Sequence, residues 1–182
     1  MIIRNNKRGF TLIEALVVIA IIGILSVTIT ANYSSMRYKF ALLRSAHQLS
    51  QDIRRAQEMA TSAKKYEPTN QVPPGYGIYL IQGVGQTSYT LYADTSPLQG
   101  NQQYDNLQDA VVETFNLEEK VYIIDISSST TVSINFKGPD PVTRIYNGSS
   151  NLNSVTITLA LEHDSNITKE VTVNKVGLIY VQ

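Results

Sequence analysis

The residues that could carry chemistry lie close together near the start of the chain. Glu14 is the only charged residue of the run Phe10–Thr30, FTLIEALVVIAIIGILSVTIT. A charge at the centre of a bilayer costs ~3 kcal/mol by insertion measurements, and less near the membrane edge. A carboxylate is tolerated there if a cation meets it. Gly9 stands directly before the run, and the residues ahead of it carry only positive charges: Arg4, Lys7 and Arg8.

The element that must position Glu14 is a helix. Residues 10–30 would span roughly 30 Å at ~1.5 Å per residue, which is the thickness of a bilayer's hydrocarbon core. The basic residues lie on the N-terminal side, so the positive-inside rule places residues 1–9 in the cytoplasm. We therefore expect residues 10–30 to form a transmembrane helix.

The helix is expected to continue well beyond the apolar run, because no proline occurs before Pro68. Apolar residues then recur at spacings of four and three, which indicates one buried helix face. They are Leu42, Ala46, Leu49, Ile53, Ala56, Ala60 and Ala63. We predict one helix from about Phe10 to about Lys65, in which residues 31–65 are amphipathic and need a sheet on one side.

Residues 66–182 are predicted to form a β-rich globular domain. Three prolines and two glycines in residues 66–77 end the helix. Segments rich in Val, Ile, Thr and Tyr are expected to be strands, at Tyr76–Gln82, Ser88–Asp94, Val111–Leu117, Lys120–Ser127, Thr131–Lys137, Val155–Glu162 and Glu170–Val181. Residues 83–86 and 174–177 are expected to be turns, and residues 138–141 and 147–151 loops. The predicted fold class is α+β, with a long N-terminal helix packed on a C-terminal antiparallel β-sheet.

Residues Gly9–Leu25, GFTLIEALVVIAIIGIL, closely resemble the N-terminal signature of type IV pilins and of type II secretion pseudopilins. The resemblance implies that a prepilin peptidase cuts after Gly9 and methylates the new N-terminal residue, Phe10. Residues 1–9 would then be a leader peptide. The resemblance also implies that Glu14 serves in docking between subunits. The long helix followed by a β-rich domain extends the likeness to the architecture of the chain.

The physical chemistry of the segment agrees with this resemblance. Gly9 lets the backbone fit closely into a protease. Cleavage would create the cation that Glu14 needs, the α-amine of Phe10, and methylation would keep its charge. In a staggered bundle the amine of one subunit can approach Glu14 of a neighbour. The positive end of the helix dipole also favours a carboxylate at this position.

The resemblance implies a set of partners and a location. The partners are other copies or related pilins in a helical filament, the prepilin peptidase, the assembly platform protein with its ATPase, and the cytoplasmic membrane. The precursor would be a single-pass protein of the bacterial cytoplasmic membrane with its N-terminus inside, and the assembled form an extracytoplasmic or cell-surface filament. Residues 40–60 and the pattern from Phe136 to Val181 loosely resemble the minor pseudopilin group H. Major and minor roles stay open, as do pilus, pseudopilus and competence filament.

Other interpretations of the sequence are weaker. For an ordinary secretory signal peptide the apolar run is too long, and residues 28–30 make a poor cleavage site. A plain membrane anchor requires neither Gly9-Phe10 nor a carboxylate at Glu14. A membrane-anchored extracytoplasmic binding domain and a DNA-uptake minor pilin are the alternatives. Nucleic acid is an unfavoured partner, because removal of residues 1–9 leaves 12 basic against 15 acidic residues.

The composition argues against an enzyme. The chain has no cysteine, which excludes disulfides, thiol catalysis and cysteine-ligated metals. His47 and His163 are the only histidines, and neither lies in a cluster with metal-ligand spacing. No G-x-S-x-G motif occurs, and no helix is expected after the paired glycines of residues 75–77 and 83–85, as a phosphate loop requires. We expect no catalytic residue, no cofactor and no metal.

Overall fold

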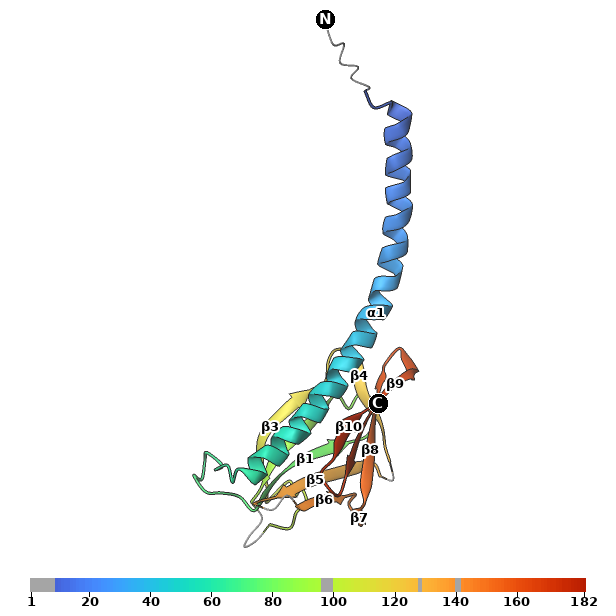
Figure 1. The fold of residues 1–182 in the computed structure, drawn as a ribbon. Coiled ribbons are helices and arrows are strands. Elements are labelled where there is room, and N and C mark those ends of the chain that lie inside the picture. The colour runs from blue at the N-terminus through green and yellow to red at the C-terminus, as the bar shows by residue number, and fades with distance from the viewer. Residues whose placement is uncertain (1–8, 96–99, 128, 140–141) are drawn as a thin grey trace, which may run out of the picture. The chain divides into compact units, whose positions relative to one another are not determined.

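The computed structural model describes residues 9–95, 100–127, 129–139 and 142–182, and within this set the side chains of residues 28–35 are not described. The basic leader therefore lies outside the described residues, apart from Gly9. The chain divides into two compact units, Met1–Arg37 and Tyr38–Gln182, and each is considered by itself. One helix, α1 (Leu12–Thr61), contributes to both units (Figure 1). The predicted long helix is thus confirmed, four residues shorter at its C-terminal end than expected.

Helix α1 ends where the backbone turns left-handed at Ala63, which has a φ of 49°. The Ala63 N–H donates to the carbonyl of Ala60 at 3.1 Å, and the Lys64 N–H donates to that of Met59 at 3.0 Å. This pair of bonds is the Schellman motif, which satisfies carbonyls that the last turn leaves without partners. Glycine usually occupies the left-handed position, so the alanine at position 63 did not indicate that the helix ends four residues before Lys65.

The predicted apolar face of the helix is buried over most of its length. Leu42, Ala46, Leu49, Ile53, Ala56 and Ala60 are each at most 5% exposed. Ala63 is exposed and lies beyond the helix, so its assignment to this face is wrong. The reason is the Schellman turn, which redirects the chain before a further helical turn can form.

The globular unit contains strands β1 (Gly75–Ile81), β2 (Ser88–Asp94), β3 (Ala110–Asn116), β4 (Val121–Ile126), β5 (Thr131–Lys137), β6 (Val142–Tyr146), β7 (Asn151–Leu152), β8 (Ser154–Leu161), β9 (Asp164–Asn174) and β10 (Ile179–Val181). All the named pairings are antiparallel. They form a six-stranded sheet, in the order β3-β2-β1-β5-β6-β7, and a four-stranded sheet, in the order β10-β9-β8-β4. The α+β class is confirmed, whereas the expectation of one sheet is wrong.

The second sheet arises because β4 does not continue the meander formed by β1, β2 and β3. Instead β4 pairs with β8, which follows much later in the chain. The turn at residues 83–86 joins β4 to the first sheet: the Ile123 N–H donates to the Gln86 carbonyl at 3.0 Å, and the Gly83 N–H to the Ile123 carbonyl at 3.1 Å. This long-range choice of partner leaves no mark in the local sequence.

Several local predictions are confirmed and a few are wrong. The Gln86 N–H donates to the Gly83 carbonyl at 3.0 Å and the Gly177 N–H to the Asn174 carbonyl at 2.9 Å, as expected for turns. The segment from Glu170 was correctly divided into two strands, but β9 begins earlier, at Asp164. Strands β6 and β7 were missed, and the predicted loop at 138–141 lies partly outside the described residues.

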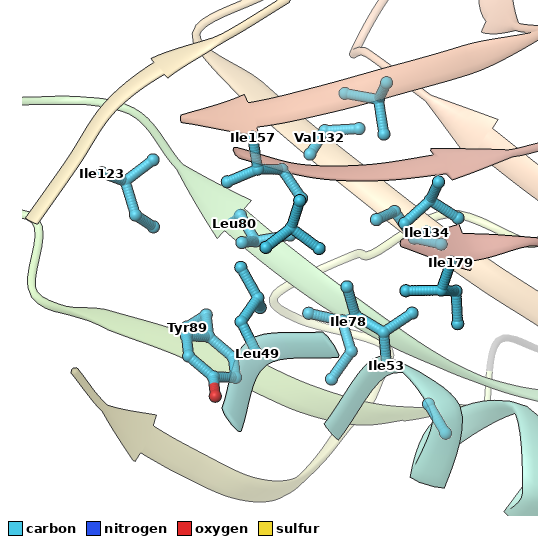
Figure 2. Packing of buried hydrophobic residues seen from close by; sticks show 14 of the residues in the cluster. Leu49, Ile53, Ile78, Leu80, Tyr89, Ile123, Val132, Ile134, Ile157 and Ile179 are labelled. Carbon is cyan, nitrogen blue, oxygen red and sulfur yellow. The ribbon is translucent and has the colours of Figure 1, made fainter. Parts of the chain in front are cut away.

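The core of the globular unit is formed jointly by the helix and both sheets (Figure 2). Leu49 and Ile53 of α1 meet Ile78 of β1 in the first sheet and Ile157 of β8 in the second, and all four side chains are fully buried. Every member of this cluster lies between Tyr38 and Val181. The core is therefore complete without the first unit.

We expect a fragment that begins near Tyr33 to fold by itself and to be monomeric. It keeps every residue of the buried cluster and lacks the exposed apolar residues from Phe10 to Val27. Size-exclusion chromatography and circular dichroism would test this. An unfolded or obligately multimeric fragment would show that the globular unit needs the first unit after all.

A half-buried carboxylate links the helix to the first sheet. The Tyr89 hydroxyl donates to Asp52 Oδ2 at 2.6 Å, and the Tyr89 ring is buried. Desolvation raises the pKa of Asp52 above its usual value, although the bond from Tyr89 and the charge of Arg55 act in the opposite direction. Between the unfolded pKa and the raised folded pKa, the unfolded chain binds fewer protons. Stability from this group therefore falls as pH rises through that window.

We predict that Asp52→Asn raises the free energy of unfolding at neutral pH and removes this part of its pH dependence. An amide oxygen still accepts the Tyr89 hydroxyl but carries no charge to desolvate. Asp52→Ala is expected to destabilise by ~1–3 kcal/mol, because it leaves the buried hydroxyl without its acceptor. Urea denaturation of both variants at several pH values measures the effect. Equal losses in the two variants would contradict the assigned role of the charge.

Candidate functional site

The candidate site lies at the first turn of α1, in the first unit. Gly9, Phe10 and Thr11 precede the helix, which begins at Leu12. The Thr11 carbonyl accepts the Ala15 N–H at 3.2 Å, the first bond of the helix. The Thr11 hydroxyl accepts the Glu14 N–H at 3.3 Å. Both bonds identify Thr11 as the N-cap residue, which satisfies one of the N–H groups that every helix start leaves without a partner.

Glu14 occupies the third position of the helix and is exposed. A carboxylate in the first turn lies in the positive end of the helix dipole. Phe10, the other predicted docking residue, has 80% of its surface exposed. Within the described part of this one chain, no hydrogen bond or ion pair joins Phe10 to Glu14. Both groups are therefore accessible to a second molecule.

Gly9 is not required by the fold of its own chain. A Cβ atom added at Gly9 would meet no other atom within 4 Å, and Gly9 is not among the residues with positive φ. A side chain at this position would neither clash nor strain the backbone. If a glycine is needed here, the need comes from a molecule that binds this segment.

The first unit exposes a continuous apolar surface after the first turn. Leu12, Ile13, Ile19 and Val27 are each 70% exposed or more, and the other large apolar residues up to Val27 are also exposed: Leu16, Val17, Val18, Ile21, Ile22, Ile24 and Leu25. No described helix segment is both long enough and apolar enough to cross a membrane. The predicted span of residues 10–30 ends among the residues whose side chains are not described.

Sequence reasoning missed Thr11 as a member of this site. The signal was present, because Thr11-Leu12-Ile13-Glu14 has the spacing of a capping box, in which a threonine cap precedes a glutamate by three residues. The resemblance implies roles for Gly9, Phe10 and Glu14 and none for Thr11. The structure adds that the predicted cleavage point, between Gly9 and Phe10, lies outside the helix.

The globular unit carries both histidines of the chain. The ring of His163 lies 5.0 Å from that of Tyr38, and His47 is exposed on α1. Among the described residues, no three His, Cys, Asp or Glu side chains gather as a metal site would require. Some charged groups of this unit are instead paired with one another, as in the two bonds of Arg44 to Glu118 at 2.7 and 2.8 Å.

Comparison with known proteins bears on the first unit. A family model described as the prokaryotic N-terminal methylation motif matches residues 4–30. The chain carries the prepilin-type motif of type IV pilins and pseudopilins. No curated protein and no solved structure matched the chain. The prepilin-type motif covers the cap, Glu14 and the exposed apolar surface, and the match stops before the globular unit.

Proposed function

We propose that the chain is a structural subunit, a pilin or pseudopilin, of a type IV pilus-like filament or a type II secretion pseudopilus. The observation that carries the proposal is the prepilin-type motif at residues 4–30. Proteins with this motif are structural subunits, not enzymes. In this proposal the chain is processed after Gly9 and assembled through its N-terminal helix.

The helix start supports the processing step. Gly9 and Phe10 lie before the first helical residue, Leu12, and Phe10 is largely exposed. Proteases cut segments that are exposed and free of regular structure. A prepilin peptidase would remove residues 1–9 and methylate the new amine of Phe10.

The charges of the first turn support the docking step. Once Phe10 is the N-terminus, its amine is a cation two residues before the helix, and Glu14 is an exposed anion within its first turn. Within the described residues of the uncleaved chain, no bond joins Phe10 to Glu14. In this proposal, the amine of one mature subunit pairs with Glu14 of its neighbour. A buried pair of this kind fixes the relative positions of two helices, since leaving either charge alone in an apolar core is costly.

In this proposal the exposed apolar surface is buried in two different environments, one after the other. In the precursor it would lie in the cytoplasmic membrane, with the N-terminus inside, and in the filament it would contact the helices of other subunits. Both environments remove the same side chains from water, and this burial contributes a favourable free energy of about 25 cal/mol per Å² of apolar surface. Other copies or related pilins, the peptidase and the assembly platform with its ATPase are the proposed partners.

The N-terminus of the protein purified from its native host tests the proposal. Intact mass and N-terminal peptide analysis should identify N-methylated Phe10 as the first residue. A chain that still begins at Met1, or one that begins near Ala31 after ordinary secretion, would refute the proposed processing. Expression of the same chain without a prepilin peptidase supplies the control, and it should yield the full-length precursor.

A further inference from the structure

Strand β3 forms an edge of the six-stranded sheet, and in the described chain it pairs only with β2. The Leu117 N–H, just after β3, donates to the Thr87 carbonyl at 2.7 Å. Backbone groups alternate in direction along an antiparallel strand, so those of Thr114 and Asn116 point away from β2. No backbone bond is found on that side among the described residues. The strand therefore presents a free edge.

This edge lacks most of the features that prevent strand pairing. Natural sheets protect their edges with charged residues, above all lysine, with proline, bulges and very short strands, or with a covering segment. Strand β3 has seven residues, AVVETFN, without lysine or proline, although a bulge follows Val111. Arg55 of α1 contacts the side chains of the strand, with Nη1 2.8 Å from Glu113 Oε2 and the guanidinium 5.8 Å from the centre of the Phe115 ring. These contacts leave the backbone of the edge unpaired.

A hollow of about 370 Å³ opens beside the first half of this strand, where α1 ends. Its lining includes Val111 of β3, which is 49% exposed, and Tyr66 from the segment after the helix. Lys64 and Lys65 line it as well. The Tyr76 hydroxyl donates to the Lys64 carbonyl at 2.8 Å, so the backbone that carries the lysines is anchored to β1.

The hollow has an excess of positive charge. Glu113 is paired with Arg55, which leaves Lys64 and Lys65 against the single carboxylate of Glu67. Both lysines are exposed, and neither has an ion-pair partner within the described residues. An anionic group that enters the hollow would gain two cations without displacing an existing pair.

We propose that the edge of β3 and the adjoining hollow bind an extended, carboxylate-bearing segment of a partner protein. The segment would add as a strand to β3, with its backbone bonded to Thr114 and Asn116. Its carboxylates would reach Lys64 and Lys65, and an apolar side chain would cover Val111. Backbone bonds supply affinity in this binding mode and side-chain pockets supply selectivity. This surface belongs to the globular unit, and the inference does not depend on filament assembly.

Fluorescence anisotropy on the full chain in detergent micelles tests the inference. The probe is a short fluorescein-labelled peptide of alternating threonine and glutamate. Two control peptides are used: one with lysine in place of glutamate, and one with alternate backbone nitrogens methylated, which keeps the charges but cannot extend a sheet. We expect saturable binding of the first peptide, at least about tenfold weaker binding of both controls, and weaker binding as salt increases.

Variants of the chain locate the site. The double variant Lys64→Glu, Lys65→Glu should bind the glutamate peptide at least about tenfold more weakly than the natural chain. The control charge reversal Lys169→Glu, on β9, should leave the affinity for the peptide unchanged. Thr114→Pro should also abolish binding, because it removes an outward N–H without breaking the ladder to β2. If that variant misfolds, the double lysine variant and the methylated peptide still test whether the peptide binds at this site.

Three outcomes would overturn the proposal. Equal binding of the methylated peptide would show that the hollow binds anions without the addition of a strand to β3. Unchanged binding by the double lysine variant would place the peptide elsewhere. Self-association of the chain that disappears in Thr114→Pro, without binding of the peptide, would make a second copy the occupant.

Discussion

Replacing Gly9 by valine is expected to leave the protein as an unprocessed, unmethylated precursor. The chain itself tolerates a side chain there, because a Cβ atom at Gly9 would meet nothing within 4 Å. A loss of processing would therefore report on the peptidase, whose close approach to the backbone a β-branched side chain obstructs. We expect at least a tenfold drop in the rate of cleavage, measured from the ratio of precursor to mature protein by mass spectrometry.

Gly9→Ala is the matched comparison, because it adds a single methyl group. It should be cleaved more slowly than the natural chain and faster than the valine variant. Circular dichroism and membrane extraction should show that both variants retain the helix and the same membrane association. Normal processing of the valine variant would mean that this glycine is not read by a protease, and the proposed maturation would fail with it.

The sequence was sufficient for features that repeat locally. The spacing from Leu42 to Ala60 predicted the buried face of α1 because a helix places residues three and four apart on one side. Strands β2 and β5 were predicted at their observed bounds, since they combine β-branched or aromatic residues with a predicted turn or loop on one side, at residues 83–86 and 138–141. These features depend on neighbours in the chain, so no knowledge of the tertiary structure was needed.

Features that depend on distant contacts were not predictable in the same way. The sequence does not show that β4 leaves the first sheet to pair with β8, or that an alanine takes the left-handed position that ends α1. For the site, the resemblance to the pilin signature pointed to Gly9, Phe10 and Glu14, but only the structure showed which bonds define the helix start. The docking partner of Glu14 lies on another molecule in our proposal, and no single chain can reveal it.

Replacing Glu14 by leucine is expected to leave membrane insertion intact and to abolish or strongly reduce filament assembly. The change removes the only charge between Phe10 and Thr30, so insertion should become more favourable by up to ~3 kcal/mol. In the filament, the amine of the neighbouring Phe10 would lose its counter-charge in an apolar core. Leaving one member of a buried pair alone typically costs ~3–5 kcal/mol. This cost arises only if the pair forms between subunits, and it then outweighs the gain on insertion.

Two further substitutions separate charge from shape at this position. Glu14→Gln keeps the size of the side chain and removes its charge, so it should fail nearly as completely as the leucine variant. Glu14→Asp keeps the charge on a shorter side chain and should be intermediate. The Thr11 hydroxyl accepts the backbone N–H of residue 14 and not its side chain, so the helix cap should survive in all three variants.

The measurement compares filament yield with the amounts of precursor and mature protein in the membrane. Crosslinking between probes at Phe10 and near Glu14 should be strong between natural subunits and lost in the leucine variant. A simple membrane anchor predicts no change in either quantity beyond slightly better insertion. Normal incorporation of the leucine variant would refute the docking role. For a minor subunit, present in few copies, incorporation of that subunit must be counted directly, because total filament yield would hide a partial defect.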